Sequence, residues 1–73
     1  MPVVDIKVIE GVFSHEEKRE AVEKISEALF ETWGEGLRNA THVIITETPS
    51  GEWAVGGKAL TADDVNEGMR TGS

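Results

Sequence analysis

The chain has 73 residues, no cysteine and a formal net charge of −7 at pH 7, from 14 acidic and 7 basic residues. This length predicts a single domain with a thin core, because so short a chain buries only about 60% of the surface that it exposes when unfolded. The composition excludes disulfides and thiolate metal sites, and the acidic balance argues against nucleic-acid binding. No apolar run approaches the ~18 residues of a membrane span, and no secretory signal is visible, so we expect a cytoplasmic protein that binds no membrane.

Residues 3–9 alternate in hydrophobicity with a period of two, which is typical of a β-strand. One face carries Val4, Ile6 and Val8, and the other carries Val3, Asp5, Lys7 and Ile9. Because Lys7 shares its face with Asp5, we expect it to form a surface or cross-strand ion pair. Glu10 and Gly11 then give a turn signal that ends the strand.

Residues 15–33 are predicted to form one amphipathic helix. Ser14 and Glu17 have the spacing of a capping box, in which each side chain satisfies a free backbone N–H of the other residue, and Gly34 is a typical C-terminal stop. Glutamates dominate the solvated face, opposite an apolar stripe of Ala21, Val22, Ile25, Ala28 and Leu29. Phe30 and Trp33 lie off this stripe and are expected to contact a partner chain.

A second strand, rich in β-branched residues, is predicted over 41–47. Two strands joined by one long helix form a βαβ unit, whose strands are expected to be parallel. The predicted fold class is therefore α/β (α+β) with two layers. The helix covers one sheet face, while the other face would expose Val3, Ile9 and Ile44 in a monomer. Since a two-stranded sheet is also too small to be stable alone, we expect the fold to depend on oligomerisation.

The remaining residues contain turn signals and a polar end. Turn residues at 49–51 and 56–57 flank a short apolar stretch, which predicts a small hairpin that carries Trp53. Residues 61–73 are polar and predict a loose C-terminal tail that docks on a neighbouring chain. We therefore expect one domain over 1–60, followed by this tail.

Four stretches carry a resemblance to a known family: PVVDIKVIEG behind Met1, the capped helix from Ser14, VIITE and EWAVGG. Together they span residues 2 to about 60, and in this order the chain resembles the 4-oxalocrotonate tautomerase family. The resemblance implies a small β-α-β tautomerase fold with a short C-terminal hairpin. It also implies a small-molecule substrate, a homohexamer built as a trimer of dimers, and an N-terminal proline that acts as general base or acid. Pro2 stands at that position.

Removal of Met1 would leave Pro2 with a free secondary amine. An α-amino group has a pKa near ~8 in model peptides, and an apolar cavity lowers this pKa towards neutrality because burial penalises the charged form. A base whose pKa lies near the working pH is the most effective proton carrier. With Met1 retained, the Pro2 nitrogen is an amide and cannot act as a base.

Two positions differ from the best-known members of the family. Those members have an arginine after the Glu-Gly turn, which binds a substrate carboxylate, and another before VIITE, which polarises the carbonyl oxygen. Here Val12 and His42 stand at these positions, while the hairpin aromatic is kept in kind as Trp53. Losing both guanidiniums removes a bidentate carboxylate clamp, so a dicarboxylate dienol is not the expected substrate.

Arg38 and His42 are the candidates to replace the missing arginines. Arg38 lies four residues before His42 and could reach the same cavity, or it could instead pair with Glu35 as a surface cation. His42 has either a role in the site or a contact with a partner chain. Trp53 either forms a wall of the pocket or packs at an interface.

The resemblance thus implies a tautomerase-type isomerase that shifts a proton between the enol or dienol oxygen and a carbon of a small 2-keto acid or similar carbonyl compound. We expect no cofactor and no metal. Two alternatives stay open: a non-catalytic subunit or small-molecule-binding protein on the same scaffold, and a hydratase- or dehalogenase-like relative. The expected catalytic residues are Pro2 and His42, and the expected substrate-binding residues are Arg38, Trp53 and Val12.

Overall fold

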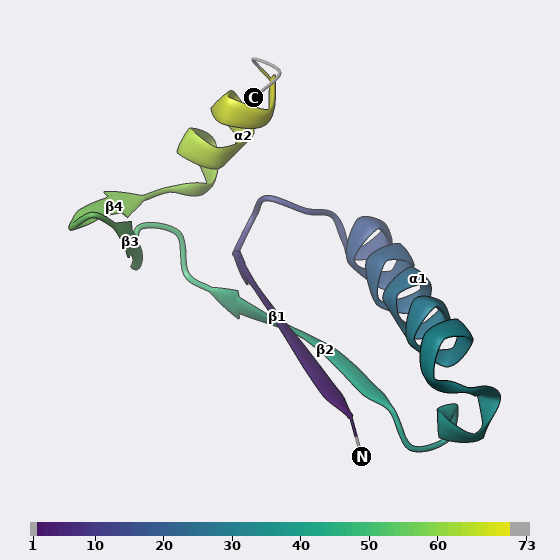
Figure 1. Ribbon diagram of the computed structural model, residues 1–73. Helices are drawn as coiled ribbons and strands as arrows, with labels where there is room; N and C mark the ends of the chain where they lie inside the picture. The colour runs from purple at the N-terminus through teal and green to yellow at the C-terminus, as the bar shows by residue number, and fades with distance from the viewer. Residues whose placement is uncertain (1, 71–73) are drawn as a thin grey trace.

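The computed structural model describes residues 2–70, and the elements of this range form a small α+β fold. Figure 1 shows the long helix beside a two-stranded sheet, with a short hairpin and a second helix beyond one end of that sheet. In chain order the elements are β1 (Val3–Ile9), α1 (His15–Trp33), the 3-10 turn η1 (Glu35–Leu37), β2 (His42–Thr48), β3 (Trp53–Val55), β4 (Lys58–Leu60) and α2 (Ala62–Arg70).

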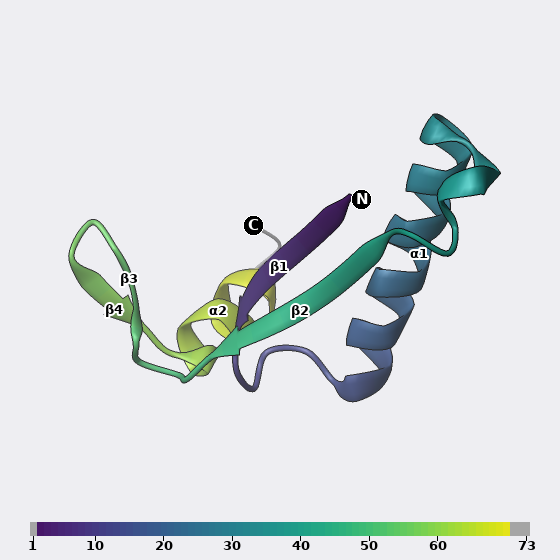
Figure 2. The ribbon, with the colours of Figure 1, turned by 90° about the horizontal axis from the view of Figure 1, so that it is seen from below.

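The β1–β2 sheet is parallel, as the βαβ pattern predicted. Its register runs from Val3 opposite His42 to Ile9 opposite Thr48. β2 begins and ends one residue later than the predicted strand over 41–47. Figure 2 shows the two strands side by side, with α1 next to β2. On the face towards α1, side chains of both strands and the helix surround one apolar cavity, among them Ile6, Val8, Ile45, Ala21 and Ile25.

The helix α1 has the bounds that its capping residues predicted. The Ser14 backbone N–H donates to Glu17 Oε1 at 2.8 Å, and the Glu17 N–H donates to Ser14 Oγ at 3.1 Å, which completes the capping box. At the other end, Gly34 has φ 110°, a value that favours glycine, and its N–H donates to the Phe30 carbonyl oxygen at 2.8 Å.

Phe30 was predicted to contact a partner chain, but its side chain is buried within its own subunit. Its side chain is 5% exposed, and the Arg38 guanidinium lies 4.5 Å from the centre of its ring. After α1 the chain turns back through η1, and this turn places Arg38 over the Phe30 ring. Trp33, by contrast, is 58% exposed.

The hairpin forms as predicted, but residues 62–70 of the predicted loose tail form a helix, while 71–73 lie outside the described residues. β3 and β4 are antiparallel and turn at Gly56 and Gly57, whose positive φ values of 60° and 84° suit a tight hairpin turn. Residues 62–70 then form the helix α2. The Thr61 N–H donates to Asp64 Oδ2 at 3.0 Å, and the Asp64 N–H donates to Thr61 Oγ1 at 3.2 Å. These two bonds satisfy backbone N–H groups that would otherwise be free at the start of α2. The polar composition of this segment therefore does not prevent it from forming a helix.

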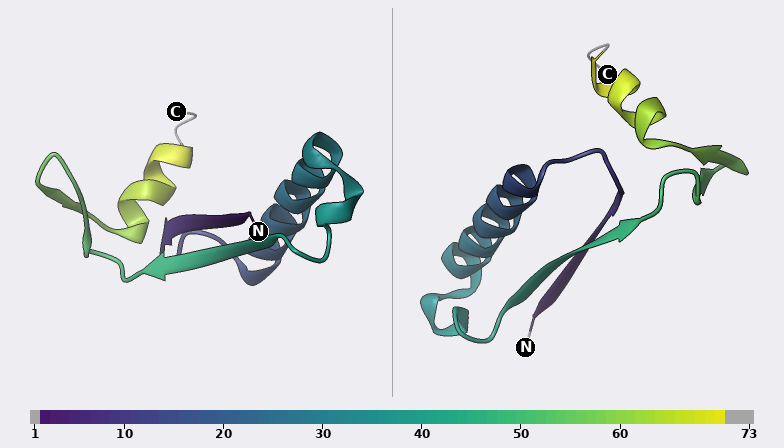
Figure 3. Two further views of the ribbon diagram at one scale, coloured as in Figure 1. Left: turned by 60° about the horizontal axis from the view of Figure 1, so that its bottom comes forward. Right: turned by 180° about the vertical axis from the view of Figure 1, so that it is seen from behind.

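The sheet face away from α1 is only partly covered. Val3 is 63% exposed and Ile44 is 48% exposed, whereas Ile9 at the carboxyl end of β1 is buried at 6%. Figure 3 shows from two further sides that the hairpin and α2 lie beyond this carboxyl end of the sheet, away from the N-terminus. Within residues 2–70, no helix combines the length and hydrophobicity needed to cross a bilayer.

Candidate active site

Pro2 and His42 lie together at the amino end of the parallel sheet. The His42 backbone N–H donates to the Pro2 carbonyl oxygen at 3.0 Å, and Val3 is the register partner of His42. Pro2 is half-buried and His42 is exposed. The parallel pairing of β1 with β2 therefore brings two of the predicted site residues next to each other, although 40 positions separate them in the chain. A proline amine and an imidazole are both groups that carry protons near neutral pH.

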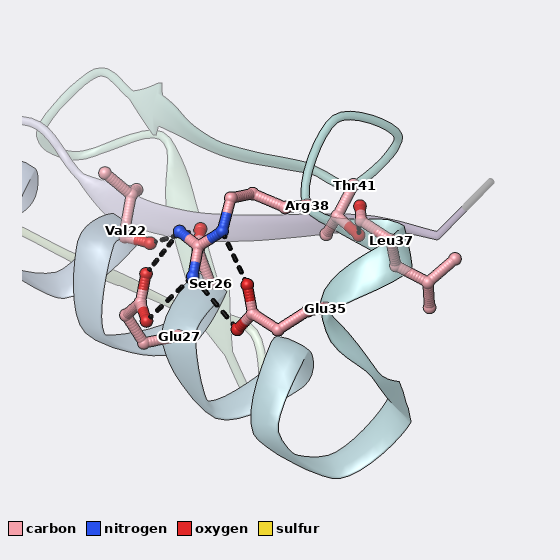
Figure 4. Close-up of polar contacts among 7 residues, drawn as sticks. All are labelled: Val22, Ser26, Glu27, Glu35, Leu37, Arg38 and Thr41. Atoms are coloured by element: carbon pink, nitrogen blue, oxygen red, sulfur yellow. Dashed lines mark hydrogen bonds and ion pairs between the residues drawn. The ribbon is translucent and has the colours of Figure 1, made fainter.

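Arg38 is held by two carboxylates of its own chain. Its Nε donates to Glu35 Oε1 at 2.9 Å, its Nη1 donates to Glu27 Oε2 at 2.9 Å, and its Nη2 donates to both residues. Figure 4 shows the guanidinium between these two side chains, one from α1 and one from η1. The pairing with Glu35 that the sequence offered as an alternative is thus present. These hydrogen bonds raise the pKa of Arg38, and the same contact lowers the pKa of Glu35. Binding of a substrate by Arg38 stays a prediction.

Val12 and Trp53 line one cavity at the carboxyl end of the sheet. This cavity has a volume of about 260 Å³ and lies between the end of β1, the loop into α1, the hairpin and α2. Most of its wall is aliphatic or aromatic. The lining residues are Lys7, Val8, Ile9, Val12, Phe13, Trp53, Leu60 and Val65. Two of the three predicted substrate-binding residues therefore share one site.

A short polar chain crosses the outer face of the sheet and reaches this cavity. The Lys7 ammonium donates to Asp5 Oδ2 at 3.0 Å, and the Thr46 hydroxyl donates to Asp5 Oδ1 at 2.8 Å. The hydrogen bond from Lys7, and then that from Thr46, lower the pKa of Asp5 and keep its carboxylate charged. Lys7 forms the ion pair that its alternation with Asp5 predicted, but it also belongs to the cavity wall, which the sequence did not indicate.

The two groups of predicted residues lie at opposite ends of β1. Pro2 precedes this seven-residue strand and Val12 follows it, so that roughly 20 Å of extended backbone separates them. Figure 1 shows the same separation between the amino end of the sheet and the hairpin that carries Trp53. A single copy of the chain therefore does not surround Pro2 with the apolar wall formed by Val12 and Trp53.

A family model described as tautomerase enzyme matches residues 2–63. The chain belongs to the tautomerase family. It is 41% identical over 61 residues to a 2-hydroxymuconate tautomerase of Bacillus subtilis (strain 168), covering 84% of this chain and 95% of that protein.

Solved structures agree with this membership. One is that of YwhB, a homologue of 4-oxalocrotonate tautomerase, with a TM-score of 0.70, 39% identity and coverage of 81% of this chain and 93% of that one. Another is a 4-oxalocrotonate tautomerase isozyme from Methylibium petroleiphilum, with a TM-score of 0.68, 30% identity and coverage of 88% and 97%. The fold and the family that the four sequence stretches predicted are therefore confirmed.

Sequence reasoning missed six residues that this tautomerase-family chain places around Val12 and Trp53. Four of them flank the Glu-Gly turn, and the other two lie in β4 and α2: Lys7, Val8, Ile9, Phe13, Leu60 and Val65. The alternation of β1 already put Lys7 and Ile9 on one face, but only the position of the hairpin and α2 shows that this face ends in a cavity. Within residues 2–70, no group of three or more His, Asp or Glu side chains is arranged to hold a metal ion.

Proposed function

We propose that the chain is a tautomerase-type isomerase that shifts a proton between the enol or dienol oxygen and a carbon of a small 2-keto acid or similar carbonyl compound. The observation that carries this proposal is the pairing of Pro2 with His42 at the amino end of the sheet, in a chain of the tautomerase family. The proposal requires that Met1 be removed, because only then is the Pro2 nitrogen a free amine.

In the proposed reaction, the Pro2 amine first accepts the proton of the enol O–H. The resulting enolate carries its negative charge on oxygen and carbon, and the imidazole of His42 stabilises the oxygen through a hydrogen bond. The protonated amine then donates its proton to the carbon, which restores the free amine and leaves the keto product. One proton moves and none is lost, so the step needs neither cofactor nor metal.

The proposal includes a site completed by a neighbouring copy of the chain. Trp53 and Val12 lie at the far end of β1 from Pro2, and a second copy that brings its cavity to this Pro2 would exclude water from the reacting atoms. The exposed Val3 and Ile44 on the outer sheet face support such an association, since a monomer would leave them in water. We propose a homohexamer, arranged as a trimer of dimers, as the active form.

The test is the rate at which the purified protein converts phenylenolpyruvate to its keto form. Intact mass first establishes that Met1 is absent. Pro2→Ala should then lower kcat by about 10²- to 10⁴-fold, which is the usual contribution of a general base. Thr32→Ala is the control, because it truncates an exposed side chain on α1 and changes neither the amine nor the outer sheet face, and it should retain activity.

His42→Ala should lower kcat less than Pro2→Ala, because it removes a hydrogen bond to the enolate and leaves the base in place. Equal rates for the wild type and Pro2→Ala would overturn the proposed function. A processed wild type with no activity above that of buffer would instead favour a binding protein or non-catalytic subunit on this scaffold.

A further inference from the structure

The cavity around Val12 and Trp53 has an uneven distribution of charge. Of its eight lining residues, Lys7 alone carries a charge, and the other seven are aliphatic or aromatic. A ligand in this cavity would therefore meet apolar side chains on most of its surface, and Lys7 is the one lining residue whose side chain ends in a cation. Small-molecule sites commonly combine an apolar wall with a few polar groups in this way.

Asp5 holds the ammonium of Lys7 in position but does not occupy all of its N–H donors. Asp5 accepts one hydrogen bond from it at 3.0 Å, and the second oxygen of Asp5 is occupied by the Thr46 hydroxyl. An ammonium group has three N–H donors, and the Lys7 side chain is 60% exposed, so that further donors remain accessible to a ligand. Thr46 and Asp5 thus limit the movement of Lys7 without covering it.

We propose that Lys7 is the carboxylate-binding residue of this cavity, and that the cavity takes a small monocarboxylate with an aromatic or alkyl body. This inference rests on the proposed function in that it names the substrate class of the same site. The volume of about 260 Å³ is slightly below the usual range for ligand sites and suits a body about the size of one ring. The carboxylate pairs with Lys7 at the rim, and the body packs against Trp53 and Val12.

The same geometry disfavours a dicarboxylate. A second carboxylate in such a ligand would find no second cation in the cavity wall, where the indole N–H of Trp53 is the one other side-chain donor. Burying a charge without a partner costs more free energy than the apolar contacts return. The cavity therefore selects for one charged end and one apolar end.

Binding measured by fluorescence tests the assignment without requiring turnover. Trp33 is exposed, and the variant Trp33→Phe leaves Trp53 as the one tryptophan of the chain. In this background we would titrate three probes: cinnamate, its neutral amide cinnamamide, and the dicarboxylate fumarate. Cinnamate should quench Trp53 at the lowest concentration, and fumarate should not bind measurably.

Lys7→Met keeps the length of the side chain and removes its charge. It should weaken cinnamate binding by about fivefold, the upper range for a partly exposed ion pair, and leave cinnamamide unchanged. Lys24→Met is the matched control, because Lys24 pairs with Glu20 on α1 and does not line the cavity, and it should bind both probes as the wild type does.

Two results would overturn the assignment: equal cinnamate affinities for Lys7→Met and the wild type, or fumarate binding as tight as that of cinnamate. Pro2→Ala should still bind cinnamate, so a failure of the proposed catalysis is distinguishable from a failure of this inference.

Discussion

Arg38 connects the helix α1 to the turn η1 that follows it. It pairs with Glu27 on α1 and Glu35 on η1, and its guanidinium covers the ring of the buried Phe30. One residue thereby fixes the end of the long helix to the turn that leads into β2. Because β2 starts with His42, the same contacts set where the amino end of the sheet lies relative to α1.

Arg38→Gln should lower Tm by several degrees, since it removes two ion pairs and uncovers Phe30. Lys24→Gln is the control, because it breaks one exposed pair between residues four apart on α1 and should change Tm little. Thermal unfolding followed by circular dichroism makes the comparison, and equal Tm values for the two variants would contradict a joining role for Arg38.

The effect of Arg38→Gln should also depend on pH. Arg38 lowers the pKa of Glu35, so this pair stabilises the fold above the unfolded pKa of glutamate, about 4.3, and the stabilisation is lost as pH falls through the lower folded pKa. The difference in Tm between wild type and variant should therefore shrink between pH 6 and pH 3. A difference that grows on acidification would contradict this pairing.

Among the elements, those defined by local patterns were predictable and those defined by packing were not. The alternation of β1 and the capping box of α1 gave the bounds that the structure has. The helix α2 was missed because its polar composition hid a second capping box, Thr61 with Asp64 three residues later. The shared cavity of Val12 and Trp53 could not be predicted, because it depends on where the hairpin and α2 pack against the end of β1.

Thr61→Ala should destabilise α2 by about 1 kcal/mol, the usual cost of losing an N-terminal cap. The readout is amide hydrogen exchange within residues 62–70, which should become faster while exchange in α1 is unchanged. Thr32→Ala provides the control, since its hydroxyl bonds to the Ala28 carbonyl oxygen in the last turns of α1 and does not cap the start of a helix. Unchanged exchange in α2 of the Thr61→Ala variant would show that packing, not capping, holds this helix.

The whole subunit is more extended than a compact domain of its length. Its radius of gyration is 14.8 Å, against about 11 Å for a compact chain of this size, and its dimensions are 42 × 23 × 20 Å. The core is correspondingly small, with Ile9 and Phe30 as its buried hydrophobic residues in the described part of the chain. An extended subunit with exposed Val3 and Ile44 fits the proposed oligomer better than a free monomer.

Ile44→Asp should shift the protein to smaller species and abolish activity, because a charge on the outer sheet face prevents another copy from covering it. Thr32→Asp introduces the same charge on the exposed side of α1 and should leave both mass and rate unchanged. Light scattering during size-exclusion chromatography measures the mass. The same mass for both variants and the wild type would place the interface elsewhere or exclude it.

The central claim is that the amine of Pro2, and not merely its ring, carries the proton. The most direct measurement compares phenylenolpyruvate conversion by the processed chain with that by a preparation that retains Met1, both verified by intact mass. The two proteins share every residue from 2 to 73 and differ at one nitrogen, which is an amine in one and an amide in the other. We predict that retention of Met1 lowers kcat by at least about 10²-fold, the loss expected when a general base is removed. Equal rates for the two preparations would contradict the claim.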